Sequence, residues 1–162
     1  MCSIFGIFDI KEHPEALRQT ALENSRLQLH RGPDWEGIYQ GDHAIIVHER
    51  LSIVDPQNGA QPLYNEDKSI VLAVNGEIYN HKDLKKELTV DYKFKTGSDC
   101  EVIIPLYEEF KRTGKNFVDR LVGDFAFVIY DAKDNTIFAA RDHMGINPMY
   151  VGTDREGRFY VA

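Results

Sequence analysis

The chain has 162 residues, of which 43% are hydrophobic and 28% are charged, and its 26 acidic and 19 basic residues give a formal net charge of −7. This length and composition are typical of one globular domain that buries about 70% of its unfolded surface, which argues against disorder. The acidic balance, with no run of Lys or Arg longer than a pair, argues against a nucleic-acid partner or an anionic membrane surface.

The first half of the chain is predicted to contain one helix and five short strands. Pro14 is expected to open the helix, with Leu17, Ala21 and Leu22 among its apolar positions. Apolar runs bounded by turn residues predict strands at 3–8, 37–40, 44–48, 51–54 and 69–74.

The second half is predicted to contain two helices, a helical turn and four further strands. A short helix is expected to begin near Asn80. Ser98 and Glu101 have the spacing of a capping box, which predicts a longer helix beginning there. Pro105 lacks a backbone donor, so it should bend this helix or leave a local defect. A helical turn is expected at 116–121, and strands are expected at 125–131, 136–141, 149–151 and 158–161.

This order of elements predicts an α+β domain in which sheets are layered against helices. The helices lie between groups of strands that short turns connect, which disfavours an alternating parallel sheet. No composition shift, low-complexity tract or repeat marks a second domain, so residues 1–162 are expected to form one domain.

The two cysteines and the start of the chain indicate a cytoplasmic protein. Cys2 and Cys100 are too few for a secreted disulfide framework. The first apolar run ends at Asp9 and Lys11, and no basic segment precedes it, so no signal peptide is expected. No run approaches the roughly 20 apolar residues of a membrane-spanning helix, so we expect no membrane partner.

Common cofactor and metal motifs are missing from the sequence. There is no GxxxxGK[ST], GxGxxG, HExxH or CxxC motif. The six histidines are scattered without the spacing of helical metal ligands. We therefore predict no metal site.

Four polar segments interrupt the apolar strands, namely HRGPD (30–34), HERLSIVD (48–55), NGEIYN (75–80) and TGSDCE (96–101). Taken singly, each has a structural explanation. Asn75 and Gly76 have the sequence of a hairpin turn, Arg50 could form a surface ion pair, and Asp99 could stabilise a helix N-terminus.

Cys2 directly follows the initiator methionine, and it has two explanations. It could be a small buried residue that begins a core strand. Alternatively, removal of Met1 would leave a thiol beside a free α-amine, a nucleophile with its own base. Because an α-amine has a pKa of about 7.7–8.0 and a thiol about 8.5, the proton could pass between them near neutral pH without a large penalty.

Taken together with Cys2, the segments HRGPD, RLSIVD (50–55), NGEIYN and RDHMGINPMY (141–150) resemble the glutamine-hydrolysing domain of the class II glutamine amidotransferases. The motifs are most similar to the bacterial B type of glutamine-dependent asparagine synthetases, and the resemblance covers essentially all 162 residues. It implies a four-layer αββα sandwich of mostly antiparallel sheets, as in the N-terminal-nucleophile hydrolases. It also implies conversion of L-glutamine into glutamate and ammonia.

The resemblance implies roles for the catalytic residues. Cys2 would attack the side-chain amide of glutamine, and the Asn75 amide and the Gly76 N–H would stabilise the tetrahedral oxyanion. Loss of ammonia would leave a γ-glutamyl thioester on Cys2, which water would hydrolyse.

Further residues are expected to bind the amino-acid head of glutamine. Arg50 matches the family's arginine for the α-carboxylate, which suits the bidentate geometry of guanidinium. Glu77 and Asp99 match the family's acidic partners of the α-ammonium group. The backbone around Ile53 and Val54 lines the same pocket by resemblance.

The family also carries a synthetase domain, and nothing resembling its ATP-pyrophosphatase loop occurs in this sequence. We expect no cofactor in the present domain, because ATP and Mg²⁺ are implied only for the synthetase domain, the expected acceptor of the ammonia. A homodimer is a further expectation. Two other hypotheses stay open. One is a glutaminase domain that serves another acceptor, as in β-lactam synthetase-like, sugar or purine enzymes, and the other is a non-catalytic domain that binds glutamine.

Overall fold

The computed structural model describes residues 1–52 and 59–162. The expected substrate contacts Ile53 and Val54 lie outside these described residues, as does half of the strand expected at 51–54. Leu51 and Ser52, the described half of that strand, are not in a strand.

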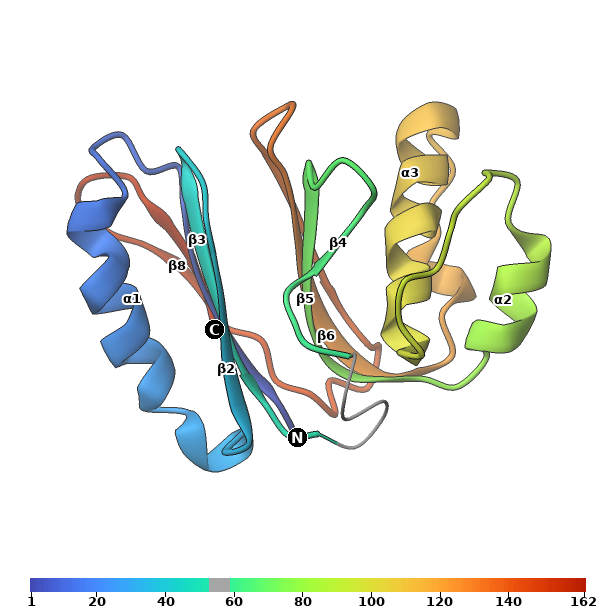
Figure 1. The fold of residues 1–162 in the computed structure, drawn as a ribbon, viewed down its shortest axis with the longest axis horizontal. Helices are drawn as coiled ribbons and strands as arrows, with labels where there is room; N and C mark the ends of the chain where they lie inside the picture. The colour runs from blue at the N-terminus through green and yellow to red at the C-terminus, as the bar shows by residue number, and fades with distance from the viewer. Residues whose placement is uncertain (53–58) are drawn as a thin grey trace.

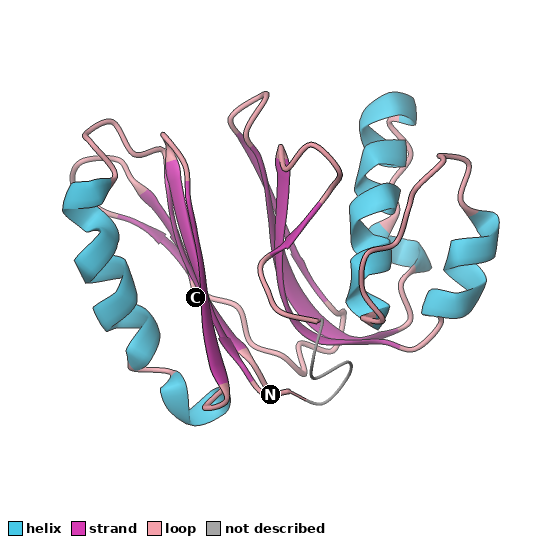
Figure 2. Cartoon of the chain, in the orientation of Figure 1, coloured by secondary structure: helices cyan, strands magenta, loops and turns pink. Residues whose placement is uncertain are grey.

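Two antiparallel sheets pack face to face, and helices cover the outer face of each (Figures 1 and 2). The first sheet contains β1 (Ser3–Phe8), β2 (Trp35–Gln40), β3 (Ala44–Arg50), β8 (Val151–Thr153) and β9 (Phe159–Val161), in the order β2-β3-β1-β9-β8. The second contains β4 (Leu63–Tyr64), β5 (Ile70–Ile78), β6 (Gly123–Asp131) and β7 (Thr136–Arg141), in that order. Helix α1 (Glu15–Arg26) covers the first sheet, and α2 (His81–Glu87) and α3 (Ile103–Thr113) cover the second. The predicted αββα sandwich is confirmed.

Each sheet is covered on both faces, so its central strands are buried along most of their length. All six residues of β1 are buried, as are all seven of β3. Successive side chains of these strands point to opposite faces. One set packs between the sheets, and it includes Ile4, Phe8, Ala44, Ile46, Val71, Ala73, Val128 and Tyr130. The other set packs against the helices.

The dipeptide Asn75-Gly76 lies inside β5, which continues to Ile78, so the hairpin-turn explanation is wrong. Pairing with β6 explains the difference, because Asn75 faces Ala126 and Gly76 faces Phe125 within a continuous ladder. Long-range pairing thus overrides the local turn preference of these two residues.

The expected capping box at Ser98 is only half right. The Ser98 hydroxyl accepts a hydrogen bond from the Cys100 N–H at 3.3 Å, which caps a 3₁₀ helix, η2 (Asp99–Val102). Glu101 does not close the box, because its carboxylate accepts from the N–H groups of Lys95 (2.7 Å) and Thr96 (2.8 Å). It therefore holds the segment that precedes the helix.

Pro105 lies in the first turn of α3, directly after η2. The missing donor therefore falls where 3₁₀ geometry changes to α geometry, and not in the middle of an α-helix. The expected bend or local defect assumed one α-helix that begins at Ser98, whereas η2 takes the place of its first turn.

Three shorter elements complete the chain. The 3₁₀ helices η1 (Leu29–Arg31) and η3 (Val118–Arg120) precede β2 and β6, and the second of them corresponds to the expected helical turn. Strand β4 was not expected from the sequence, since it has only two residues.

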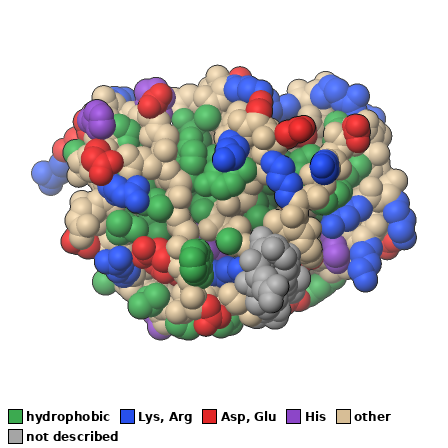
Figure 3. Space-filling model, in the orientation of Figure 1, with side chains coloured by type: hydrophobic (Ala, Val, Ile, Leu, Met, Phe, Trp, Pro, Cys, Tyr) green, Lys and Arg blue, Asp and Glu red, His purple; other side chains and the backbone are tan. Residues whose placement is uncertain are grey.

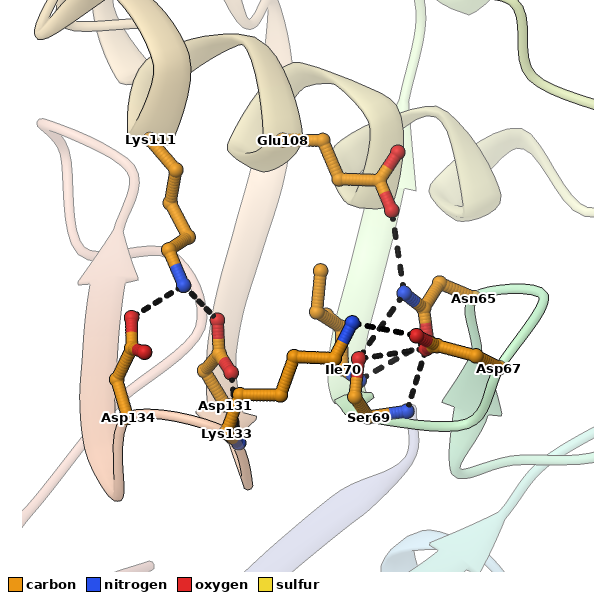
Figure 4. A network of polar contacts seen from close by, with 9 residues as sticks. All are labelled: Asn65, Asp67, Ser69, Ile70, Glu108, Lys111, Asp131, Lys133 and Asp134. Carbon is orange, nitrogen blue, oxygen red and sulfur yellow. Dashed lines mark hydrogen bonds and ion pairs between the residues drawn. The ribbon is translucent and has the colours of Figure 1, made fainter.

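A network of polar contacts ties the turns at one end of the second sheet to α3 (Figure 4). Lys111 on α3 forms ion pairs with Asp131 and Asp134. Asn65 accepts from the Ile70 N–H at 3.0 Å and donates to Glu108 on α3 at 3.2 Å. These contacts fix the β4–β5 and β6–β7 turns against the helix.

Acidic and basic side chains are mixed on the face shown in Figure 3, and hydrophobic side chains gather in the middle of that face. Among the described residues, no helix has both the length and the apolar character needed to cross a membrane.

His48 on β3 connects the two sheets. Its side chain is fully buried, and its Nε2 lies 3.0 Å from the carbonyl oxygen of Val74 on β5. This contact requires the proton on Nε2, which leaves Nδ1 without a hydrogen-bond partner among the described residues. Burial, with a smaller effect of the charge on Arg50, lowers the pKa of His48 to about 4.

Acidification is expected to destabilise the fold through His48. Its pKa rises from about 4 in the folded chain to its ordinary value of 6.5 on unfolding, so the unfolded state binds more protons between these values. The stability that neutral His48 contributes is complete above about pH 6.5 and is lost as the pH falls toward 4, by roughly 3 kcal/mol. Urea unfolding between pH 7 and 4 measures this loss. His48→Gln keeps a donor for Val74 and should show a weaker pH dependence; an equally steep dependence would contradict the assignment.

Near the end of β5, the lack of a side chain at Gly76 lets the backbone of β6 lie close to the backbone of β5. Its φ is +143°, and a Cβ at this position would lie 2.0 Å from the carbonyl oxygen of Asp124 on β6. Both the backbone conformation and the contact exclude a side chain.

Gly76→Ala is therefore expected to lower the free energy of unfolding by about 3 kcal/mol. The matched control is Gly152→Ala on β8, where a Cβ meets no atom within 4 Å, and it should change stability by less than about 1 kcal/mol. Urea unfolding of both variants checks this, and equal stabilities would show that the close approach at Gly76 is unimportant.

Candidate active site

Three of the expected site residues belong to the layer between the sheets. Every second residue of β1, β3 and β5 points into this layer. Cys2, Arg50 and Asn75 continue these three alternating sets. The register of β1 and β3 pairs Ser3 with Glu49, which brings Cys2 opposite Arg50 at the end of the pair. Strand pairing and alternation thus direct the three side chains toward one place.

A cavity at this end of the sandwich contains most of the expected site. Six expected residues line it, namely Cys2, Arg50, Asn75, Gly76, Glu77 and Asp99. It is also lined by Met1, Leu51, Gly59, Gln61, Ser98, Cys100, Asp124 and Asn147. The other two expected residues, Ile53 and Val54, lie outside the described part of the chain.

Cys2 is partly buried, and its thiol is held by the backbone of Leu51. Its Sγ lies 3.7 Å from the Leu51 carbonyl oxygen and accepts from the Leu51 N–H at 3.4 Å. Burial raises the pKa of the Cys2 thiol, although the Leu51 N–H, the charged chain terminus and the guanidinium groups of Arg50 and Arg31 oppose this. At neutral pH the thiol is therefore protonated, and attack on a carbonyl carbon requires a base.

Cys100 is a second thiol at the same cavity, but its surroundings make it unreactive. Its side chain is buried, with Sγ 3.4 Å from the Gly76 carbonyl oxygen and 3.6 Å from the Asp99 carboxylate. Burial and the negative charge of Asp99 raise the pKa of Cys100 well above its ordinary value. Since the thiolate is the nucleophilic form, Cys2 is the better candidate of the two.

The charged residues of the cavity match an amino-acid head group. Arg50 is only 5% exposed, and Asp99 is 8% exposed. The Asp99 carboxylate accepts from the Ile78 N–H at 2.6 Å, which fixes it to the end of β5, while Glu77 is exposed at the rim. A buried guanidinium can pair with the carboxylate of a zwitterion, and the neighbouring carboxylates can pair with its ammonium group.

The backbone N–H of Gly76 points away from β6. The Gln61 side chain bonds both the N–H (2.7 Å) and the carbonyl oxygen (3.0 Å) of Val74 on the side of β5 opposite β6. In a strand, the backbone groups of residues two positions apart point to the same side, so those of Gly76 point to the same side as those of Val74. In agreement, the Gly76 carbonyl oxygen accepts a hydrogen bond from the Cys100 thiol and not from β6. The Gly76 N–H is thus a donor on the side where no strand continues the ladder among the described residues.

Sequence reasoning missed Asn147, in the loop between β7 and β8. Its Oδ1 accepts a hydrogen bond of 3.0 Å from Asn75 Nδ2, and its side chain is fully buried. The residue lies in the quoted segment RDHMGINPMY, but its partner is 72 residues away in the sequence. No local spacing could have identified this contact.

Comparison with known proteins identifies the family. Residues 1–162 match the model of the glutamine amidotransferase domain. The chain is 59% identical over 162 residues to asparagine synthetase B (glutamine-hydrolysing) of Escherichia coli (strain K12), a match that covers 100% of this chain and 29% of the relative. A glutamine-hydrolysing asparagine synthetase of Brassica oleracea is 50% identical over 162 residues, with 100% of this chain and 27% of the relative covered. The chain thus spans less than a third of the length of these relatives.

A solved structure shares the fold. The glutamine phosphoribosylpyrophosphate amidotransferase from B. subtilis, complexed with ADP and GMP, superposes with a TM-score of 0.71 at 23% identity, over 99% of this chain and 41% of that chain. This likeness shows that the two chains share the sandwich fold. The family model and the identity along the whole chain confirm the resemblance seen in the sequence: this chain belongs to the glutamine amidotransferase domain family and is homologous to a domain of the glutamine-hydrolysing asparagine synthetases.

Proposed function

We propose that this chain is the glutaminase domain of an asparagine synthetase and converts L-glutamine into glutamate and ammonia, with Cys2 as the nucleophile. One observation carries the proposal: Cys2 directly before β1, Arg50 at the end of β3 and Asn75 on β5 line one cavity. The family and the 59% identity to a glutamine-hydrolysing enzyme support the same chemistry.

The first step needs a base, and the α-amine of Cys2 supplies it after Met1 is removed. Met1 is 53% exposed, so an aminopeptidase can reach it. While Met1 is attached, the nitrogen of Cys2 belongs to a peptide bond and is not basic. The freed amine takes the thiol proton, and the thiolate attacks the amide carbon of glutamine.

The tetrahedral intermediate is stabilised by hydrogen bonds from Asn75 Nδ2 and the Gly76 N–H to its oxyanion. As the intermediate collapses, the α-ammonium group returns the proton to the leaving nitrogen, and ammonia is released. The γ-glutamyl thioester on Cys2 then reacts with water, which gives glutamate and restores the thiol.

Selection of glutamine follows from the charges around the cavity. Arg50 pairs with the α-carboxylate, and Glu77 and Asp99 pair with the α-ammonium group. A site built to pair charged groups discriminates strongly against amides that lack them. A contribution from the backbone of Ile53 and Val54 stays a prediction, because these residues are outside the described part of the chain.

The ammonia is proposed to pass to a synthetase part of a longer protein in the cytoplasm, where ATP and Mg²⁺ activate aspartate. The relatives that match along the whole chain support this acceptor, since they are asparagine synthetases more than three times as long. The likeness to the phosphoribosylpyrophosphate amidotransferase concerns the fold alone and does not favour purine chemistry. A homodimer stays a prediction.

Cys2→Ala is expected to abolish glutaminase activity because it removes the nucleophile. The chain with Met1 removed, as confirmed by its mass, should release glutamate from glutamine without ATP. Cys100→Ala is the matched control, and it should retain turnover because the buried Cys100 thiol takes no part in the reaction. A coupled assay for glutamate checks all three proteins. Turnover in Cys2→Ala comparable to that of the unmodified chain would refute the proposal.

Arg50→Lys is expected to raise KM for glutamine by about ten- to hundredfold, because lysine keeps the charge but loses the bidentate pairing. The value of kcat should change little, since the α-carboxylate is bound equally in the ground state and the transition state. Arg155→Lys in the exposed turn before β9 is the control and should leave both constants unchanged. Steady-state kinetics would count against this role if KM were the same in Arg50→Lys and the unmodified chain.

A further inference from the structure

The pair formed by Asn75 and Asn147 contributes little to the stability of the fold. Both side chains are buried, at 5% and 0% exposure, and one hydrogen bond of 3.0 Å joins them. The remaining polar atoms, Asn75 Oδ1 and Asn147 Nδ2, have no hydrogen-bond partner among the described residues. Two unsatisfied buried polar atoms cost about as much as one hydrogen bond contributes, or more. The pair therefore needs an explanation other than stability.

The loop that carries Asn147 is anchored beside the end of β5. The Asp142 carboxylate accepts from the N–H groups of Phe125 and Ile146, each at 3.2 Å, and the Asp142 N–H donates to the Phe125 carbonyl oxygen at 2.8 Å. Phe125 is the residue opposite Gly76 in the β5–β6 register. The loop is thus fixed to the segment of β6 that faces Asn75 and Gly76.

The chemistry of an amide group shows what this contact does. Asn75 Nδ2 carries two N–H bonds, and one of them is directed to Asn147 Oδ1. The terminal torsion of asparagine has a broad, roughly two-fold preference, so the amide of Asn75 could turn over and place its oxygen where the nitrogen now lies. An oxygen in that position would repel an oxyanion. In the structure Asn147 presents its oxygen to Asn75, and this contact matches the orientation in which the Asn75 nitrogen is presented.

We infer that Asn147 is a positioning residue of the oxyanion site. It holds the Asn75 amide by one N–H, so that the second N–H is kept for the developing oxyanion. The inference rests on the proposed function, in which Asn75 donates to that oxyanion. Asn147 itself acts through Asn75 and touches neither Cys2 nor the reacting carbon in this role.

Asn147→Leu tests this role, because leucine has a similar size and cannot accept a hydrogen bond. The value of kcat for glutamine hydrolysis is expected to fall about tenfold, less than the 10²–10³-fold typical for loss of an oxyanion donor itself. KM for glutamine should stay within about threefold, because the contact matters in the transition state. The midpoint of thermal unfolding should change little, since one unsatisfied atom is removed and another is created. Asn147→Ala serves the same test if the leucine variant does not fold.

A double-mutant cycle separates positioning from a general structural effect. In an Asn75→Ala background, Asn147→Leu should have no further effect on kcat, because the amide that it positions is gone. Asn65→Ala is the matched control, since Asn65 is also buried and hydrogen-bonded but belongs to the network of Figure 4. It should lower stability and leave kcat unchanged.

The possible results distinguish the inference from the proposed function. An active unmodified chain with kcat unchanged in Asn147→Leu would overturn the inference alone, as would an equal loss of kcat in the two backgrounds. A correctly processed chain that releases no glutamate would overturn the proposed function and the inference with it. A loss of kcat that vanishes in the Asn75→Ala background supports both.

Discussion

The face-to-face packing of two β-sheets is the constraint on which the site depends. Every second side chain of β1, β3 and β5 points into the space between the sheets, and most of these side chains are apolar. At one end of the sandwich, the next residues in this alternation are Cys2, Arg50 and Asn75. The core and these residues of the cavity therefore form one layer, and the packing of the core sets where the three side chains lie.

Burial at this end decides which groups can serve as acid or base. His48 belongs to the same layer, but its Nε2 is hydrogen-bonded to the Val74 carbonyl oxygen, and burial lowers its pKa to about 4. The imidazole of His48 is therefore neutral at pH 7, and its proton is used in this hydrogen bond. Burial also raises the pKa of the Cys2 thiol. A nucleophile in such a place requires a proton acceptor close by, and the α-amine that removal of Met1 frees is attached to the same residue. The proposed mechanism uses this amine as the base.

Several features that cost stability lie together at the end of the second sheet. Gly76 has a backbone conformation that side chains rarely adopt, and its neighbour Asn75 belongs to a buried amide pair with unsatisfied atoms. On the side of β5 away from β6, the Gln61 side chain takes the place of a neighbouring strand at Val74, and no strand pairs with Gly76 on that side among the described residues. Strain, unsatisfied polar groups and an interrupted ladder in one place are typical of functional sites.

The sequence by itself determined most of the strands and helices and the set of chemical groups, because alternation, caps and motifs are properties of short segments. It could not place Asn75 and Gly76, whose local preference is for a turn, until pairing with β6 some fifty residues later held them in a strand. Nor could it find the contact of Asn147 with Asn75, or the use of Glu101 to hold the backbone at Lys95. These features depend on contacts between distant segments, which only the packed structure creates.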